Sequence, residues 1–468
     1  MDGRAAQRRS ESVVAIVGGG ASAALTAAHL LLRGDRVPPR VVVFDRDGRH
    51  GLGQAYATED PRHLLNAPAA RMSAFADDPD HLVRWARARG LDASGADFLP
   101  RTLYGCYLQD LLAEASARHP GKLTQITATV TGVEPGRDRA WHVHGTDGAS
   151  LEADAVVLAT GNRAPTAWPW APDDPRYIAD PWRPGALDGV SGGPVLIVGT
   201  GLTMVDVATT IASRDPGTIV YAASRHGLLP RAHRSPAPPA AVISPPPGEL
   251  TVTDLLHLFT AALASSDGEW RGVVDGLRPH VPDLWGRLRL AERQRFLSSY
   301  ARQWEVRRHR IPPATATRID DLRATGRLRV LRGLIDAVDP TRDHLKVTLA
   351  TDGPTRELDI AWIINSTGPA ADPRSEPLLR GLLDSGLVAT DPLRLGLTAD
   401  SCGCAVDESG RTRHDLFTLG PTLRGLRYET TAIPEIREQA AHLASAHLAK
   451  LSTPVERADV LTSQPLLR

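Results

Sequence analysis

The sequence predicts an α/β protein in which two parallel-sheet units of similar design carry a helical insert. Three observations predict this fold class. A short buried strand, a glycine-rich turn and a helix occur near residue 18 and recur near residue 199. Further short apolar runs, typical of buried strands, follow each copy. Between about residues 235 and 310, a proline-rich connector and helical spacing of apolar residues replace that pattern.

The first unit starts with a β-branched strand at Val13–Val17, followed by three glycines, a helix that runs through Leu32 and a second strand at Val41–Phe44. Further strand patterns are bounded by Gly, Pro or Ser, and they lie at 155–159, 195–198, 219–222 and 360–365. The helix from Leu202 to Ala212 follows the second glycine turn. This alternation of strands and helices predicts parallel sheets.

The insert begins with a linker from Pro236 to Pro247, because so many prolines exclude regular structure. Helices are expected at Thr253–Ala264 and Leu288–Arg308. The second of these places several apolar residues close to one face, namely Leu290, Phe296, Leu297, Tyr300 and Trp304.

Composition excludes several classes of protein. The 468 residues carry 54 Lys and Arg against 54 Asp and Glu, which argues against a nucleic-acid partner. The longest apolar run, around Leu25 to Leu32, is far shorter than the roughly 18 residues that span a bilayer, so we expect no membrane partner. No apolar signal core precedes Val13, which predicts a cytoplasmic location. The oligomeric state is not predicted.

Cysteine and lysine usage narrows the chemistry. Cys106, Cys402 and Cys404 are too few for a disulfide framework and lack the paired spacing of a structural zinc site, so we expect no metal. We interpret the Cys402–Cys404 pair as incidental. No GxxxxGK phosphate loop is present, which excludes P-loop NTPases.

The first glycine turn has the spacing GxGxxA, formed by Gly18, Gly20 and Ala23. Gly18 permits a tight turn, Gly20 lets a pyrophosphate approach the backbone, and Ala23 allows close packing of helix on sheet. Asp45 ends the next strand, where it can accept hydrogen bonds from a ribose 2′-hydroxyl. The neighbouring Ser22 and Arg46 are expected to contact the same ligand. Taken alone, the pattern is equally explained by ordinary turn and cap chemistry.

The second turn repeats this spacing at Gly199, Gly201 and Met204, and we expect Leu202 and Thr203 to begin the helix beside the ligand. Here Ser224 and Arg225 follow the next strand in place of an acid. An arginine at that position pairs with a 2′-phosphate, which favours NADP(H) over NAD(H). A surface arginine without a ligand is the alternative interpretation.

Two later strands end in small residues, at Thr160–Gly161 and at Thr367–Gly368. Small residues at the carboxyl edge of a parallel sheet let backbone and cofactor meet. The order of turn, closing strand, turn and closing strand predicts two Rossmann-like dinucleotide-binding domains, one for FAD and one for NADPH.

The chain resembles the two-dinucleotide-binding flavoproteins, and within them the bacterial FAD-NAD(P)-binding family related to flavin-dependent N-hydroxylating monooxygenases. The residues that carry the resemblance span roughly 12 to 445, at 51–56, 63–68, 72–73, 77–79, 199–206, 224–230 and 308–310. The resemblance implies an FAD domain built from both ends of the chain, to which Gly420, Pro421 and a helix from Pro434 return. It also implies that His63, Leu65 and Asn66 lie near the flavin, and Gly53 and Gln54 of the first matching stretch are expected to contact the cofactor. For Asn66, a loop cap is an equal alternative.

The domain ranges expected from these patterns follow the chain. The FAD-binding domain takes 12–190 and a return segment at 369–445, and the NADP-binding domain takes 191–234 and 311–368. The linker and insert occupy 235–310, and a C-terminal tail occupies 446–468.

By analogy with the family, we expect a flavin- and NADPH-dependent oxidoreductase, a monooxygenase that uses O2 on a small molecule. N-hydroxylation of an amine or amino acid in bacterial specialised metabolism is the expected reaction. A flavin reductase that passes electrons to a protein or quinone is one alternative, and a non-catalytic FAD/NADP-binding sensor is another.

No catalytic residue is predicted. Asp77, Arg308 and His309 are candidate substrate contacts. An acidic turn and a solvated helix end are the alternative interpretations of these residues.

Overall fold

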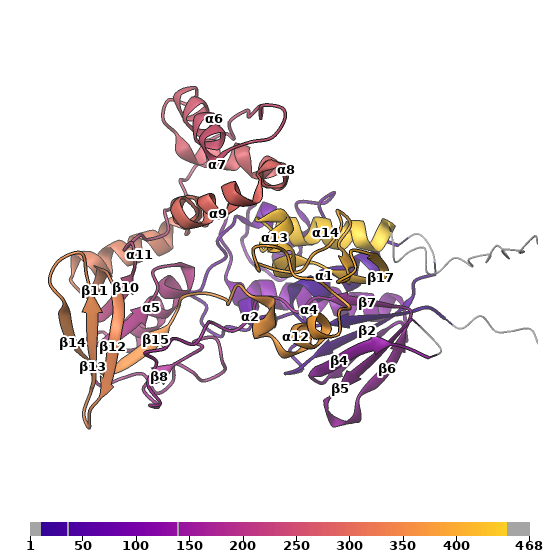
Figure 1. Cartoon of the computed structure of the whole chain (residues 1–468), viewed down its shortest axis with the longest axis horizontal. Coiled ribbons are helices and arrows are strands. Elements are labelled where there is room, and N and C mark those ends of the chain that lie inside the picture. The colour runs from indigo at the N-terminus through magenta and orange to yellow at the C-terminus, as the bar shows by residue number, and fades with distance from the viewer. Residues whose placement is uncertain (1–10, 35–36, 138–139, 447–468) are drawn as a thin grey trace, which may run out of the picture.

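The computed structural model describes residues 11–34, 37–137 and 140–446. Two sheet units lie side by side, and a stack of helices projects from their junction (Figure 1). No helix in these ranges is both long and apolar enough to cross a membrane. The predicted tail, 446–468, lies outside the described residues except for its first position.

The first unit is a six-stranded sheet in the order β16-β17-β7-β1-β2-β3. All neighbouring strands are parallel except β16 and β17, which are antiparallel. Its strands are β1 (Val13–Val17), β2 (Arg40–Asp45), β3 (Leu123–Thr127), β7 (Ala155–Leu158), β16 (Cys404–Val406) and β17 (Thr412–Thr418). Strands from both ends of the chain therefore build one sheet.

Both faces of this sheet are covered, which explains why its central strands are continuously apolar. Val14 and Ile16 pack on one face against α1 (Ala21–Leu32), α4 (Arg101–Arg118) and α14 (Ile433–Ala446). Ala15 and Val17 pack on the other face, which is covered by α12 (Pro377–Asp384) and a small antiparallel sheet of β4 (Val130–Pro135), β5 (Trp141–Gly145) and β6 (Ser150–Ala153).

The second unit is a five-stranded parallel sheet in the order β11-β10-β9-β15-β8. Its strands are β8 (Tyr177–Ile178), β9 (Val195–Val198), β10 (Val220–Ser224), β11 (Leu328–Arg332) and β15 (Trp362–Asn365). Helices α5 (Leu202–Arg214) and α11 (Pro313–Ala324) cover one face. The antiparallel strands β12 (Leu334–Pro340), β13 (Leu345–Ala350) and β14 (Arg356–Ile360) cover the other.

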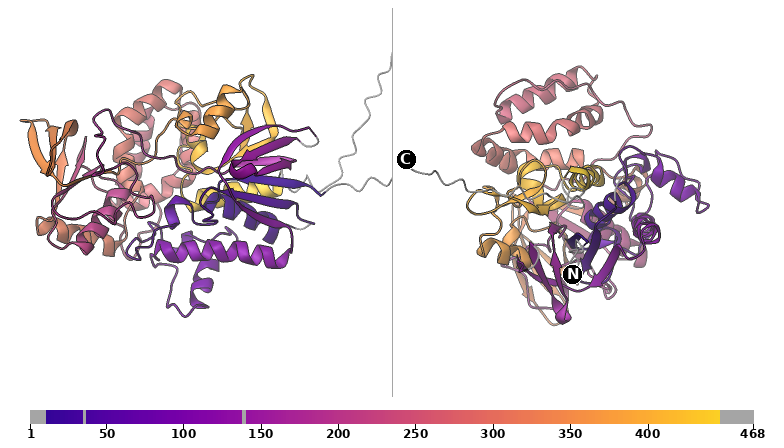
Figure 2. Two further views of the ribbon diagram at one scale, coloured as in Figure 1. Left: turned by 90° about the horizontal axis from the view of Figure 1, so that it is seen from below. Right: turned by 90° about the vertical axis from the view of Figure 1, so that its right-hand side faces the viewer.

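The insert is helical, as expected, and consists of α6 (Val252–Ala264), α7 (Trp270–Leu277), α8 (Val281–Arg287), α9 (Leu290–Ser299) and α10 (Ala301–Arg308). Figure 2 shows this stack resting on the C-terminal helices α13 (Arg424–Arg427) and α14. The proline-rich stretch from Pro236 to Pro247 has no helix or strand. Two short helices complete the first unit, α2 (Gly53–Tyr56) and α3 (His81–Arg87).

Two predicted elements are each divided in the structure. The expected helix over Leu288–Arg308 breaks at Tyr300, whose φ of −124° turns the chain so that α10 leans against the sheet units. The expected strand over 360–365 is two strands in different sheets, because Ala361 turns away and donates its N–H to the carbonyl of Pro194.

Strand β8 bears on the predicted domain boundary. It lies inside the range 12–190, yet Tyr177 and Ile178 pair with Ile363 and Ile364 of β15 in the second sheet. We therefore propose that the first unit ends before β8, because the chain has already joined the second sheet there.

Candidate active site

The first glycine turn joins β1 to α1. Gly18 has φ +105°, and a Cβ there would lie 2.3 Å from the carbonyl oxygen of Ala159, so no other residue fits. Gly20 is the N-cap of α1. A Cβ on it would lie 3.3 Å from the Cα of Gly53, which begins α2 with φ +53°. Gln54 follows within α2. The turn thus keeps the helix N-terminus free of side chains, as an anion site requires.

Asp45 ends β2 beside this turn, and its carboxylate lies against Gly19, where a Cβ would be 2.6 Å from Oδ2. Oδ1 accepts main-chain N–H groups of Asp47 (3.0 Å) and Arg49 (2.8 Å), which fix the side chain in place. Arg46 points outward and pairs with Asp47 at 3.1 Å. Ser22 and Ala23 are buried in α1.

The second turn repeats the first in the other unit. Gly199 has φ +111°, and a Cβ there would lie 2.5 Å from the carbonyl oxygen of Ser366. Gly201 is the N-cap of α5, ahead of Leu202 and Thr203, and a Cβ on Gly201 would meet nothing within 4 Å. This helix N-terminus therefore opens onto free space large enough for a ligand to approach the backbone.

The strand after the second turn ends at Ser224 and is followed by Arg225. Ser224 Oγ hydrogen-bonds Thr200 Oγ1 at 2.8 Å and accepts the N–H of Gly227 at 3.1 Å. The neighbouring Arg225 is exposed, and none of the hydrogen bonds or ion pairs found among the described residues involves its side chain. Its guanidinium is available to an external anion.

The closing strands present small residues at the same edges. Gly161 has φ +68° and Gly368 has φ +86°, and a Cβ on either glycine would meet nothing within 4 Å. Thr160 has a buried Oγ1 without a hydrogen-bond partner among the described residues. Thr367 Oγ1 donates to Asn365 Oδ1 at 2.8 Å. Both closing strands therefore leave space for a ligand at the sheet edge.

The return segment reaches the first glycine turn. Gly420 (φ +71°) donates its N–H to Gln439 Oε1 of α14 at 2.8 Å, and a Cβ there would lie 3.0 Å from Ser22 Oγ. The adjacent Pro421 is buried and lines the cleft described next. The C-terminal part of the chain therefore lies beside the first glycine turn.

A cleft of about 370 Å³ lies between the two units, with α10 as one wall. The first unit and its return segment, the second unit, the connections between them and α10 all contribute. Its lining includes Ala55, Tyr56, Leu65, Asn66, Met72, Arg101, Arg163, Gly201, Leu202, Pro230, Arg302, Glu305, His309, Ala370, Pro421, Arg424, Tyr428, Glu429 and Ile433. Predicted residues of both dinucleotide sites thus meet in one cavity.

Charged side chains hold this cleft together. Arg101 of α4 pairs with Asp206 of α5 at 2.9 Å, and both are nearly buried. Burial raises the pKa of Asp206, and the charge of Arg101 opposes that rise. Arg302 donates to the carbonyl of Leu228 at 2.7 Å. These contacts join the first unit to the second and fix α10 against the second glycine turn.

Two glutamates of the cleft differ in the pKa that their surroundings impose. Burial raises the pKa of Glu305, although Arg424 at 3.3 Å and Arg302 oppose it. Burial also acts on Glu429, but the charge of Arg308 and a hydrogen bond from Trp304 Nε1 (2.7 Å) lower its pKa overall. Glu429 is therefore anionic near neutral pH.

The candidate substrate residues have different positions. His309 lines the cleft, and burial lowers its pKa to about 4, so its ring is neutral near pH 7. The structure contradicts both expectations for Arg308. It is not at a solvated helix end or free to bind a substrate, because it is 9% exposed and lies 3.3 Å from both Glu429 and Glu435. Asp77 lies on the surface, where it pairs with Arg33 at 3.5 Å, and it does not line the cleft.

His63 makes a contact with the second unit that the sequence did not predict. Its Nε2 lies 2.9 Å from Thr210 Oγ1 of the second unit, and its Nδ1 lies 2.7 Å from Thr58 Oγ1. The ring is buried, does not line the cleft and so joins the two units. Leu65 and Asn66 do line it, and the carbonyl of Asn66 is 3.0 Å from His233 Nε2.

The cysteines lie away from the cleft and are free thiols. Burial and the nearby Asp400 raise the pKa of Cys404 to about 12, which leaves it a poor nucleophile. Among the described residues, two groups of side chains have metal-ligand atoms within 4.8 Å of one another, Glu134, His142 and His144 on the small sheet and Asp400, Cys404 and His414 near β16. Neither group lines the cleft.

This fold is that of two-domain FAD/NADP flavoproteins. Residues 15–163 match the family model described as FAD-NAD(P)-binding. The comparison with curated proteins yielded no match.

Three solved structures are similar over nearly the whole chain. The cadaverine monooxygenase of Erwinia amylovora, bound to FAD, has TM-score 0.65 and 14% identity, covering 98% of this chain and 99% of its own. The L-lysine 6-monooxygenase from Pseudomonas syringae has TM-score 0.64 and 18% identity, covering 94% and 100%. The ornithine N-hydroxylase of Kutzneria sp. 744, with reduced FAD, NADP+ and L-ornithine, has TM-score 0.62 and 16% identity, covering 93% and 98%.

Sequence reasoning missed several residues of the cleft, above all Arg101, Arg163, Arg302, Glu305, Arg424 and Glu429. They come from segments that are distant in sequence and belong to no glycine motif. No sequence signal marks them, because the helical spacing continues through Tyr300, where the structure turns α10 and its charged residues toward the sheets.

Proposed function

We propose that this chain is an FAD- and NADPH-dependent monooxygenase that hydroxylates an amine nitrogen of a small molecule. The observation that carries the proposal is the single cleft in which Leu65, Asn66 and Pro421 of the predicted FAD domain face Gly201 and Leu202 of the second glycine turn. In the balanced reaction, the amine, O2, NADPH and a proton give a hydroxylamine, NADP+ and water. The amine specificity rests on the similarity to an ornithine N-hydroxylase and to monooxygenases of lysine and cadaverine.

The residues present fit two dinucleotides. FAD would be held by the first turn at Gly18 and Gly20, by Asp45, by Thr160 with Gly161, and by Gly420. Gly20 lies opposite another glycine and leaves a backbone cradle, and the buried Thr160 Oγ1 has no protein partner among the described residues. FAD bound there would supply hydride acceptance and oxygen activation, which no side chain of the protein performs.

NADPH would be held by Gly199, Gly201, Ser224, Arg225 and Gly368. Open space at Gly201 and Gly368 leaves room for a ligand, and Arg225 has the free guanidinium that a 2′-phosphate requires. The position of NADPH in the cleft would be set by Leu202 and Pro230 on one side and by Leu65 and Asn66 on the other.

The chain's own residues would bind the substrate and exclude water. Glu429 lines the cleft as a buried anion, and beside its contacts with Trp304 and Arg308 its carboxylate oxygens have lone pairs left for an ammonium group of the substrate. The neutral ring of His309 offers a hydrogen bond without adding a positive charge beside that ammonium group. Helix α10 closes one side of the cleft, which limits access of water to the reacting groups.

Oxygen consumption tests this proposal. Purified protein with FAD and NADPH should consume O2 faster when ornithine, lysine or cadaverine is added, and a hydroxylamine product should form in proportion to NADPH oxidised. NADPH oxidation that requires an added quinone, with no hydroxylamine, would establish the flavin reductase instead. Bound nucleotides without turnover on any acceptor would establish a sensor.

A further inference from the structure

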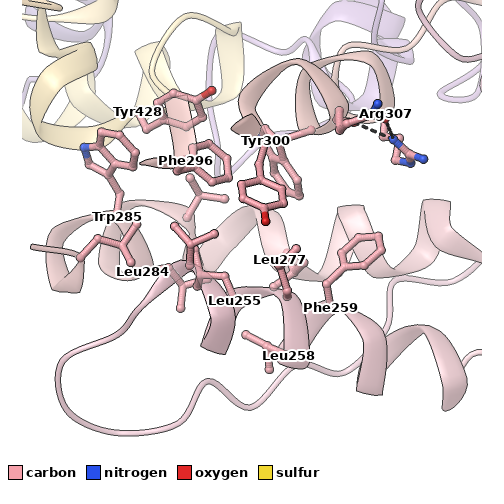
Figure 3. Close-up of a pocket in the computed structure, with 16 residues that line it drawn as sticks. Leu255, Leu258, Phe259, Leu277, Leu284, Trp285, Phe296, Tyr300, Arg307 and Tyr428 are labelled. Carbon is pink, nitrogen blue, oxygen red and sulfur yellow. Dashed lines mark hydrogen bonds between the residues drawn. The ribbon is translucent and has the colours of Figure 1, made fainter. Parts of the chain in front are cut away.

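The helical insert contains a cavity of about 360 Å³ that is separate from the dinucleotide cleft. Figure 3 shows it between α9 and α10 on one side and α6 and α7 on the other. Its walls are almost entirely aliphatic and aromatic, among them Leu258, Phe259, Leu277, Trp285 and Phe296. Protein interiors are close-packed, so a cavity of this size in a small helical unit indicates a binding site.

The helices around this cavity are incompletely buried. In α6 only Val252 is buried, and in α9 no residue is. Leu255, Leu258 and Phe259 of α6 are half-buried although they form its apolar face. An apolar molecule in the cavity would remove these side chains from water and so gain the hydrophobic free energy that the insert alone leaves unused.

Polar groups gather along one face of α10, at its wall of the cavity. Tyr300, Gln303 and Arg307 all line the cavity, and Figure 3 shows the ring of Tyr300 turned into it. The Tyr300 hydroxyl has no hydrogen bond among the described residues. Arg307 Nη1 donates to the Gln303 carbonyl at 2.9 Å and to Gln303 Oε1 at 2.8 Å. A few convergent polar groups in an otherwise apolar site fix the orientation of a ligand.

The charge at this wall is positive and unpaired. No carboxylate of the described residues lies within ion-pair distance of Arg307. Burial lowers the pKa of Arg307, and the like charge of Arg231 lowers it further. Arg231 is held close because its main-chain N–H donates to the carbonyl of Val306 at 2.8 Å. Two guanidinium groups without an acidic partner favour an anion.

We propose that this insert cavity binds a medium-chain aliphatic carboxylate, with its chain among the leucines and aromatic rings and its carboxylate on Arg307 and Tyr300. A cavity of about 150 Å³ accommodates benzene, so this volume holds roughly 14 non-hydrogen atoms, or a chain of about ten to twelve carbons with its head group. The inference does not depend on the function proposed for the dinucleotide cleft.

The cavity and the cleft are separate sites that share a wall, so a competition experiment can distinguish them. Tyr428 lines both, and α10 contributes Trp304 to the cavity and Glu305 to the cleft. A ligand of the insert should therefore bind while both dinucleotides are in place.

The test is calorimetric titration of dodecanoate, below its micellar concentration, into the full-length protein saturated with FAD and NADP+. Saturable binding with one site is expected, accompanied by a change in tryptophan fluorescence, because Trp285 and Trp304 line the cavity. Dodecyltrimethylammonium, with the same chain and the opposite charge, should bind at least tenfold more weakly. No binding of dodecanoate, displacement by NADP+, or equal affinity for the two head groups would overturn the proposal.

Substitutions test whether dodecanoate binds in the insert cavity and on Arg307. Leu258→Trp fills the cavity and should weaken dodecanoate binding at least tenfold, whereas Leu290→Trp changes an exposed leucine of the same unit that does not line the cavity and should leave it unchanged. Arg307→Gln should weaken dodecanoate about tenfold or more but leave dodecanol unaffected. Arg295→Gln, on exposed α9, is its control. Should Leu258→Trp fold poorly, Arg307→Gln still decides the matter, because unchanged discrimination between carboxylate and alcohol would refute the site.

Discussion

Gly20 and Gly201 occupy equivalent positions in the two units, and each keeps a helix N-terminus open. We expect Gly20→Val to abolish FAD binding, because the branched side chain would fill the space of a pyrophosphate and press on Gly53. The absorbance spectrum of the purified variant measures this directly.

Gly201→Val is the matched control, since its added atoms meet no protein atom within 4 Å of the new Cβ. It should keep FAD and lose NADPH. A variant pair in which both bind FAD, or neither does, would contradict the assignment of one dinucleotide to each turn.

Arg225 decides between the two nicotinamide cofactors. Arg225→Ala should weaken NADPH by about 10- to 100-fold and NADH hardly at all, because only NADPH loses a charge-assisted hydrogen bond. Titration of each cofactor against flavin fluorescence measures the ratio. Arg46→Ala removes the corresponding arginine of the first unit, which pairs with Asp47, and should leave the ratio unchanged. Equal weakening of NADPH and NADH by Arg225→Ala would refute its role.

His309 should make stability depend on pH. Its pKa is lowered by burial from 6.5 to about 4, so between these values the unfolded chain binds more protons than the folded one. The free energy of unfolding therefore falls as the pH drops from 6.5 toward 4, by up to about 3 kcal/mol. His309→Gln should remove this part of the dependence in urea titrations across that range, while the exposed His257→Gln should not. An unchanged slope in His309→Gln would show that the ring is not buried as a neutral group.

At the scale of elements, helices α4 and α5 carry the buried pair that joins the two units. Arg101→Met leaves Asp206 without its partner and should lower the free energy of unfolding by about 3 to 5 kcal/mol. The double variant Arg101→Met/Asp206→Leu should recover much of that loss, because no buried charge remains. Urea unfolding of the unaltered protein and of the two variants measures these differences. A double variant as unstable as Arg101→Met would show that packing, and not the ion pair, dominates this junction.

Elements with local signals were predictable, and elements that depend on distant contacts were not. β1 and β9 have the predicted bounds because a β-branched run next to a glycine turn is a local signal. The helical spacing over 288–308 carried no sign of the turn at Tyr300. That turn lets Arg302 reach the carbonyl of Leu228 and Trp304 reach Glu429, partners that are remote in sequence.

The residues of the candidate site also fall into those that a local signal predicts and those that depend on distant contacts. The positions of Gly18, Gly20, Gly199 and Gly201 follow from one repeated spacing and meet the predicted edges of both sheets. The true environment of Arg308 could not be predicted, because the two glutamates that surround it belong to the return segment and α14. Ion pairs between separate segments leave no pattern in a single sequence.

At the scale of the whole molecule, the interleaving of the chain places the cleft. The first sheet takes strands from both ends of the chain, the second sheet lies between them in sequence, and α10 of the insert leans over the junction. Similar folds over at least 93% of this chain are found in an ornithine N-hydroxylase, an L-lysine 6-monooxygenase and a cadaverine monooxygenase. The cytoplasmic location stays a prediction.

Anaerobic mixing of the FAD-loaded protein with NADPH tests most directly whether electrons cross between the two sites. The oxidised-flavin absorbance should disappear at a rate that saturates with NADPH, and Gly201→Val should retain its flavin yet leave it oxidised. Flavin that stays oxidised in the unaltered protein, or protein that takes up no FAD at all, would contradict a cleft shared by two dinucleotides.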